Sequence, residues 1–252
     1  MPICGGGNPA LAASFRDVPV WNFHAANDDV VSVNESRSMI SALREAGGSP
    51  IYTEYASGGH VSWPAAYRNP YVVEWTFAQR RGEPSTTDPH VSFLNPMEQD
   101  SFTTGAAALE LSGAASAYGE PITQVKWTST LTRAPGLASG TNTWNADGIP
   151  LQRAGTNLIV VTATTTSWSD EFGGATTFNR ALAVQQAAPI YATITRGETK
   201  LVLDWSGGAP PFRVERLNAV ASGGWMEVLN NAVAPVTLPS ETESAFYRIA
   251  GQ

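Results

Sequence analysis

The sequence is poor in the residues that define several classes of protein. Its 252 residues include a single cysteine, Cys4, so no disulfide can form within the chain. That cysteine and three scattered histidines make no zinc-binding pattern. The 15 basic residues are outnumbered by 22 acidic ones, which argues against a broad basic surface for nucleic acid or anionic lipid. We therefore expect no cofactor, no metal ion and no nucleic-acid partner.

Long apolar runs are also missing. No stretch approaches the roughly 18 to 20 residues of a membrane-spanning helix. The segment Met1–Gly7 lacks the basic start and apolar core of a signal peptide. The composition, with 42% hydrophobic and 15% charged residues, is nevertheless that of a folded protein. The length fits two or three domains.

Residues 1–82 alternate between strand and helix signals. Pro19–Phe23 is apolar throughout, as in a strand covered on both faces. Ser32 and Glu35 form a capping-box pattern at the start of a helix, and Ile51–Tyr55 predicts a second strand. Two further helical segments follow, at 63–67 and from Asn69 to Gly82. This order predicts a parallel sheet, but two strands are too few for a complete one, so we expect the trailing edge of a larger domain with an exposed sheet edge.

The rest of the chain reads as β-structure. Residues 83–89 have the composition of a linker, after which the apolar period changes to two. Short strands over residues 90–187 predict an immunoglobulin-like sandwich with Trp127 in its core, and residues 188–252 predict a small β-domain. The expected strands are 91–94, 107–112, 122–128, 140–144, 157–164 and 177–184, then 191–195, 200–205, 212–217, 225–229, 236–238 and 245–249. Asp147-Gly148 is a turn signal, and Asn145–Gly148 suits a hairpin turn better than a calcium loop.

Two segments that follow the predicted strands carry an acid and a histidine. His24-Ala25-Ala26-Asn27-Asp28-Asp29-Val30-Val31 resembles the segment that holds the catalytic acid in α/β-hydrolases, and Gly58-Gly59-His60 before Trp63 resembles their catalytic-histidine segment. The likeness covers residues 1–82 and points to secreted esterases related to polyhydroxybutyrate depolymerases, feruloyl esterases and prolyl-oligopeptidase-like hydrolases. It implies that Asp28 is the triad acid and His60 the base, since the chain order in this superfamily is Ser, Asp, His. Asp29 would then face solvent, and His24 would be structural.

The serine nucleophile of the α/β-hydrolases is missing, because no G-x-S-x-G pattern occurs in the sequence. The expected fold is therefore a partial α/β-hydrolase, comprising the last two parallel strands with helices, followed by two all-β modules. The expected function is the C-terminal fragment of a secreted serine hydrolase acting on an ester, peptide or polysaccharide-linked substrate, with a signal peptide presumed upstream. The chain alone is expected to be inactive. Cys4 could act as a nucleophile, but a small buried residue at a strand end is the simpler reading, and Gly5–Gly7 reads as a plain loop.

An alternative function needs no nucleophile. In it the β-modules act as a non-enzymatic cell-surface or carbohydrate-binding protein, and the α/β segment is inert. Four tryptophans could line a sugar-binding face, although core positions are their default: Trp144, Trp168, Trp205 and Trp225. In a third possibility, another polypeptide completes the sheet at the exposed edge.

Overall fold

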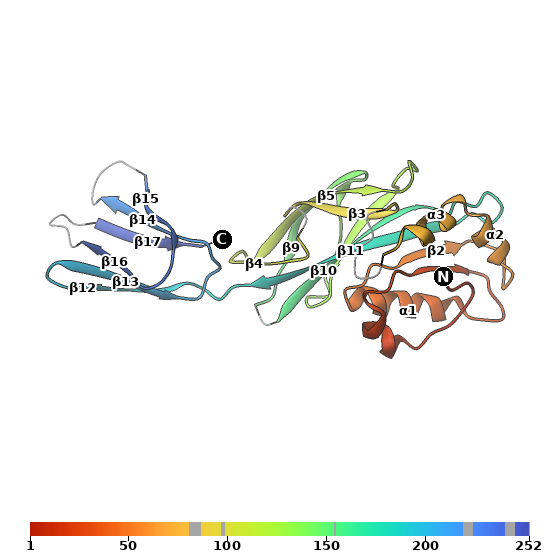
Figure 1. Cartoon of the computed structure of the whole chain (residues 1–252), viewed down its shortest axis with the longest axis horizontal. Coiled ribbons are helices and arrows are strands. Elements are labelled where there is room, and N and C mark those ends of the chain that lie inside the picture. Colours follow the sequence, from red (N-terminus) through yellow and green to blue (C-terminus); the bar gives the residue numbers. More distant parts are fainter. Residues whose placement is uncertain (81–86, 97–98, 154, 219–223, 240–244, 252) are drawn as a thin grey trace. The chain divides into compact units, whose positions relative to one another are not determined.

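A computed structural model describes residues 1–80, 87–96, 99–153, 155–218, 224–239 and 245–251. Strands account for 47% and helices for 15% of the structure (Figure 1). The chain divides into two compact units. Unit 1 comprises Met1–Ser101, Ala108–Pro150 and Asn157–Ala183, and unit 2 comprises Phe102–Ala107, Leu151–Thr156 and Val184–Gln252. The protein is thus mostly β.

The N-terminal part of unit 1 contains the predicted strand pair. β1 (Trp21–Ala25) and β2 (Ile51–Tyr55) are parallel, with Trp21 opposite Ile51. Between them, α1 (Val33–Glu45) packs Ile40 and Leu43 against Tyr52, together with the 3₁₀ helix η1 (Pro9–Phe15). The Ser32 hydroxyl caps α1 by accepting from the Asn34 N–H. Because β1 and β2 are parallel, both strands end at the same edge of the sheet.

The outer edge of β2 is covered by a strand from far along the chain. β11 (Ala175–Gln186) runs antiparallel to β2, with Thr176 opposite Thr53. The two threonine hydroxyls hydrogen bond at 2.8 Å, and Trp21 Nε1 donates to Thr53 Oγ1 at 3.0 Å. β1 and β2 are therefore the end of a seven-stranded sheet of order β1-β2-β11-β10-β6-β7, with β4 also pairing with β11.

The predicted fold class, a partial α/β-hydrolase followed by two β-modules, is therefore wrong. The sheet that begins with β1 and β2 continues through antiparallel strands of the sandwich, and the described residues form a mostly β protein in several sheets. The strand and helix signals of residues 1–82 were local, and they could not show which strand pairs with the edge of β2. The sequence pattern predicts an exposed edge here, but in the structure this edge of β2 is paired with β11.

The second sheet of unit 1 completes the sandwich. It has the order β3-β5-β9-β8, and its strands are antiparallel. Phe93 and Trp144 are fully buried and meet edge to face. The bounds are β3 (His90–Asn95), β4 (Ser101–Thr104), β5 (Ala108–Ser116), β6 (Gln124–Ser129), β7 (Pro135–Leu137), β8 (Ser139–Gly140), β9 (Thr143–Pro150) and β10 (Thr156–Thr166).

Unit 2 holds two three-stranded sheets, with orders β12-β13-β16 and β15-β14-β17 (Figure 1). Its core contains Leu203, Trp205 and Val214, with Phe212 and Tyr247 packed against it. The bounds are β12 (Tyr191–Arg196), β13 (Lys200–Ser206), β14 (Phe212–Asn218), β15 (Met226–Ala232), β16 (Val236–Pro239) and β17 (Ala245–Ala250).

Most strands lie where the alternating pattern predicts them, and Trp127 is buried as expected. β4 and β7 are additional. Asp147-Gly148 is not a turn, because both residues lie inside β9 at a register shift opposite β5. Gly148 has a φ of +68°, the left-handed conformation that suits a β-bulge. An Asp-Gly pair can form either a turn or a β-bulge, so the sequence alone does not show which of the two it forms.

Two short helices complete unit 1. α2 (Trp63–Arg68) and α3 (Pro70–Ala78) follow β2, and α3 places Trp75 edge-on against Trp21. Gly82, the predicted end of the last helix, and residues 83–86 of the predicted linker lie outside the described residues. The domain boundaries 1–82, 83–89, 90–187 and 188–252 stay predictions. Among the described helices, none is long and apolar enough to cross a membrane.

Candidate functional site

The two predicted site residues meet at the C-terminal edge of the parallel strands. Asp28 lies in the loop after β1, and His60 lies in the loop after β2. Gly58 and Gly59 take φ values of +117° and +57°, which few other residues adopt, and so turn the chain back toward β1. The Gly59 N–H donates to Asn27 Oδ1 at 2.9 Å and ties the two loops together.

The Asp28 carboxylate is enclosed by hydrogen-bond donors. Its side chain has no exposed surface, and Oδ1 accepts from the N–H groups of Val30 and Val31, both at 2.9 Å. His60 Nδ1 lies 3.0 Å from Oδ2. Burial alone would raise the pKa of Asp28, but the backbone bonds from Val31 and Val30 and the bond to His60 outweigh it and lower that pKa to about 2. Asp28 is therefore an anion throughout the neutral range.

His24 supports the same carboxylate from inside the protein. Its ring is fully buried, and Nε2 lies 3.1 Å from Asp28 Oδ2 and 3.0 Å from the Val31 carbonyl. Both neighbours are acceptors, so Nε2 carries the proton. Nδ1 then pairs with Ser36 Oγ at 2.8 Å. The expected structural role of His24 fits this geometry, since its ring has no access to solvent.

Cys4 joins the site from a third segment. Ile3 forms a parallel bridge with Phe23, and the Cys4 N–H donates to the Phe23 carbonyl at 2.9 Å. Cys4 is buried, has a φ of +50°, and places Sγ 2.8 Å from Ser62 Oγ. One potential ligand atom from each of Cys4, Asp28 and His60 lies within 4.8 Å of the others. The cluster thus gathers a thiol, a carboxylate and an imidazole.

Sequence reasoning found two members of this cluster and missed the third. The roles of Asp28 and His60 as triad acid and base stay a prediction, although the structure brings the two side chains together as that prediction requires. Cys4 was assigned to a strand end, which is where it lies. Nothing in the sequence near Cys4 marks the loops it faces, because its neighbours are 24 and 56 positions away in the chain.

The four tryptophans considered for sugar binding have different environments. Trp144 is fully buried and Trp205 is 9% exposed, so both are core residues. Trp168 lies among Trp21, Tyr71 and Tyr118. Trp225, just before β15, is the one with an exposed side chain, at 36%.

Trp225 belongs to an amphipathic surface on the sheet β15-β14-β17. Arg248 lies over its ring, 4.5 Å from the centroid, and pairs with Glu215 on the next strand. Phe246, two residues before Arg248, shares this face and is 60% exposed. Leu217 lies opposite Phe246 in the ladder and therefore points the same way. We call these five residues, Trp225, Phe246, Leu217, Arg248 and Glu215, the aromatic face.

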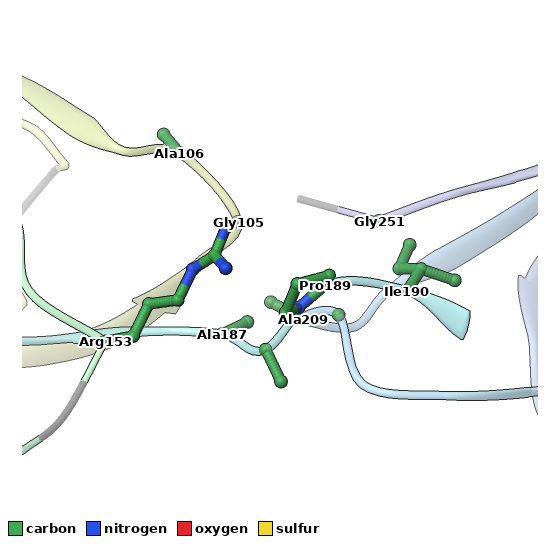
Figure 2. A pocket seen from close by; sticks show the side chains of 10 residues that line it. Gly105, Ala106, Arg153, Ala187, Pro189, Ile190, Ala209 and Gly251 are labelled. Carbon is green, nitrogen blue, oxygen red and sulfur yellow. The ribbon is translucent and has the colours of Figure 1, made fainter.

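The described residues also line two cavities. In unit 2, a cavity of about 320 Å³ is lined mainly by glycine, alanine and proline, and Arg153 is its one charged lining residue among those described (Figure 2). In unit 1, an open cleft of about 510 Å³ is lined by Tyr71, Trp168, Glu120 and Asp170 together with small and hydroxyl residues. Few polar groups converge in the first cavity, which gives it little capacity for specific binding.

Comparisons with known proteins assign no family. No family model and no curated protein matches the chain. Among solved structures, domains A168–A170 of titin match with 14% identity and a TM-score of 0.31, covering 63% of this chain and 58% of that one. A tetra-tandem repeat from the extending region of a large adhesion protein matches with 10% identity and a TM-score of 0.24, covering 64% of this chain and 40% of that one. Such TM-scores are too low to indicate a shared fold, so the fold assignment rests on the sheet topology.

The resemblance to secreted esterases is therefore not sustained, and neither is the serine-hydrolase function drawn from it. The parallel strands belong to a mostly β sheet, and no hydrolase family matches. The non-enzymatic alternative agrees better with these findings.

Proposed function

We propose that this chain is a carbohydrate-binding β-module protein of the cell surface or the secreted compartment, and that the aromatic face is its binding surface. The observation that supports the proposal is an exposed tryptophan and an exposed phenylalanine on one sheet face, beside a half-exposed arginine.

The chemistry of this surface matches that of a sugar ring. A pyranose has apolar faces of C–H groups and an equator of hydroxyls. The rings of Trp225 and Phe246 offer flat apolar area, and large aromatic side chains dominate the energetics of such contacts. The Arg248 side chain is 50% exposed, and its Nε–H donates a hydrogen bond to the Glu215 carboxylate, which holds the side chain in place. The guanidinium therefore has further N–H groups with which to donate to hydroxyls.

The position of the aromatic rings also argues for binding. Exposed aromatic side chains are costly to leave in water, and a contiguous apolar patch bordered by polar residues marks an interaction surface. Among the described residues of unit 2, Tyr191 is also an exposed aromatic residue, and it lies on β12 in the other sheet. It provides a matched control for Phe246, since it is 68% exposed and lies off the aromatic face.

Retention of the full chain on a panel of insoluble polysaccharides tests the proposal. We expect the wild-type protein to be retained on at least one of them, and both Trp225→Ala and Phe246→Ala to release it. Tyr191→Ala should bind as wild type. Circular dichroism of each variant verifies folding. If no polysaccharide retains the protein, or if the Tyr191 and Trp225 variants behave alike, the proposal fails.

A further inference from the structure

Three side chains with metal-binding chemistry converge in unit 1, far from the aromatic face in the sequence. Cys4, Asp28 and His60 come from the ends of three adjacent parallel segments, the bridge at Ile3, β1 and β2. One potential ligand atom from each lies within 4.8 Å of the other two. At the usual bond lengths of 2.0 to 2.3 Å, ligand atoms around one metal lie about 3 to 4 Å apart, so these side chains would close on a single ion with shifts of roughly 1 Å.

The type of donor selects the type of ion. A thiolate and an imidazole are ligands for zinc-like transition metals, whereas magnesium and calcium prefer sites built from oxygen alone. A Cys4 thiolate and the Asp28 carboxylate would carry two negative charges, which a divalent ion neutralises. Three protein ligands leave a fourth tetrahedral position free, as in zinc sites that bind water or a substrate.

The surroundings hold each ligand in place. Asp28 is fixed by the Val30 and Val31 N–H groups and by His24 Nε2. The Cys4 backbone is held by its bond to Phe23, in a left-handed conformation unusual for a non-glycine residue. Such strain persists only where the surrounding structure imposes it. Second-shell bonds of this kind orient ligands and raise metal affinity.

Access to the site comes from one side. Cys4 is 4% exposed and the Asp28 side chain has no exposed surface, whereas 32% of the His60 side chain is exposed. An ion would therefore enter past the imidazole. The indole of Trp63 flanks that imidazole edge to face, with the ring centroids 5.9 Å apart.

We infer that Cys4, Asp28 and His60 form a binding site for a divalent transition-metal ion of the zinc type. On binding, the Cys4 thiol releases its proton to solvent. The His60 ring keeps one proton, which moves from Nδ1 to Nε2 if Nδ1 becomes the ligand atom, and Asp28 exchanges its bond with His60 for one to the metal. The dispersed spacing of the three residues explains why no metal-binding pattern is visible in the sequence. This inference is independent of carbohydrate binding.

Cobalt substitution tests it on the full chain. The protein is stripped with a chelator and titrated with Co²⁺, and the absorption spectrum is recorded. Because Cys4 is the only cysteine, any thiolate-to-cobalt charge-transfer band reports that residue alone. We expect the band, together with tetrahedral d–d bands, to saturate at one Co²⁺ per chain, and Zn²⁺ to displace the cobalt. Absence of the charge-transfer band at saturation would overturn the inference.

Substitutions identify the ligands. Cys4→Ser should abolish the charge-transfer band, and His60→Ala should weaken Co²⁺ binding by at least the roughly 10- to 100-fold that loss of a second-shell partner costs. His90→Ala is the matched control: His90 pairs with Asp88 at 2.8 Å outside this cluster, and its loss should leave the titration unchanged. If Cys4→Ser does not fold, a substitution of the half-exposed His60 provides the test. Zn²⁺ should raise the melting temperature of the wild type and of His90→Ala but not of His60→Ala. Equal stabilisation of all three would contradict the site.

Discussion

The cluster around Asp28 in unit 1 and the aromatic face of unit 2 are built in opposite ways. The cluster joins three chain segments, its central Asp28 side chain has no exposed surface, and backbone N–H groups fix that carboxylate. The aromatic face lies on and beside adjacent strands of one small sheet, and its aromatic side chains, Trp225 and Phe246, are exposed. Substitutions at buried residues of unit 1 should therefore cost more stability than substitutions of the exposed side chains on the aromatic face.

The largest expected difference concerns two tryptophans. Trp21 is fully buried, stacks on Phe23 and donates to Thr53, whereas Trp225 is 36% exposed. Trp21→Ala should lower the free energy of unfolding by about 3 to 5 kcal/mol, through lost burial and a cavity. Trp225→Ala should cost less than about 1 kcal/mol. Urea denaturation followed by circular dichroism measures both, and similar losses would remove the contrast between the units.

Removal of a buried polar side chain where β11 meets the N-terminal segment should have the next largest effect on stability. Asn179 accepts from Arg44 Nε and donates to the Gly48 carbonyl, both at 2.9 Å. Burial lowers the pKa of Arg44 to about 10, so its guanidinium depends on such partners. Asn179→Ala should cost about 1 to 3 kcal/mol of unfolding free energy. The exposed Asn230→Ala should stay within about 0.5 kcal/mol of wild type under the same urea denaturation, and a comparable loss there would weaken the argument.

Acid should weaken unit 1 through Asp28. Its pKa falls from 3.8 to about 2 on folding, so the ionised carboxylate stabilises the fold above pH 3.8, and this contribution is lost as the pH falls toward 2. In Asp28→Asn the contribution is absent at every pH, so the stability gap between wild type and variant should shrink over that window. Urea titrations from pH 6 to about 2 measure the gap. Asp29→Asn at the exposed neighbouring residue is the matched control, and a gap for Asp28→Asn that does not change with pH would refute the assignment.

The smallest expected effect lies on the aromatic face. Arg248 covers the Trp225 ring, and an exposed cation–π contact contributes about 0.5 to 1 kcal/mol. Arg248→Lys keeps the charge but loses the planar stacking and the fork of N–H donors. We expect a change in unfolding free energy below about 1 kcal/mol and a measurable weakening of polysaccharide retention. Loss of stability comparable to that of Trp21→Ala would show that this face is structural.

Local patterns predicted local structure well. The alternating residues of Lys200–Trp205 and Phe212–Leu217 gave β13 and β14 nearly to the residue, and the cap at Ser32 gave the start of α1. The same logic brought Asp28 and His60 together, because the ends of neighbouring parallel strands meet at one edge.

Pairings between distant segments were out of reach of those patterns. Nothing in Thr53 indicates that Thr176 lies opposite it, and this pairing decides whether β1 and β2 form a separate domain or the end of a sandwich sheet. Cys4 was missed for the same reason, since its strand is a single bridge too short to show a period. Short motifs specify a loop and its residues, but they do not specify the sheet into which that loop is built.

The pairing of β2 with β11 also bears on how the chain folds during synthesis. Thr53 emerges from the ribosome 123 residues before Thr176, its hydrogen-bonding partner. Until then the edge of β2 is unpaired and open to association with other chains. Contacts across such long sequence distances form late and slowly. Completion of unit 1 must therefore await translation of the strand that covers this edge, and a chaperone that shields β2 in the interval would raise the yield of folded protein.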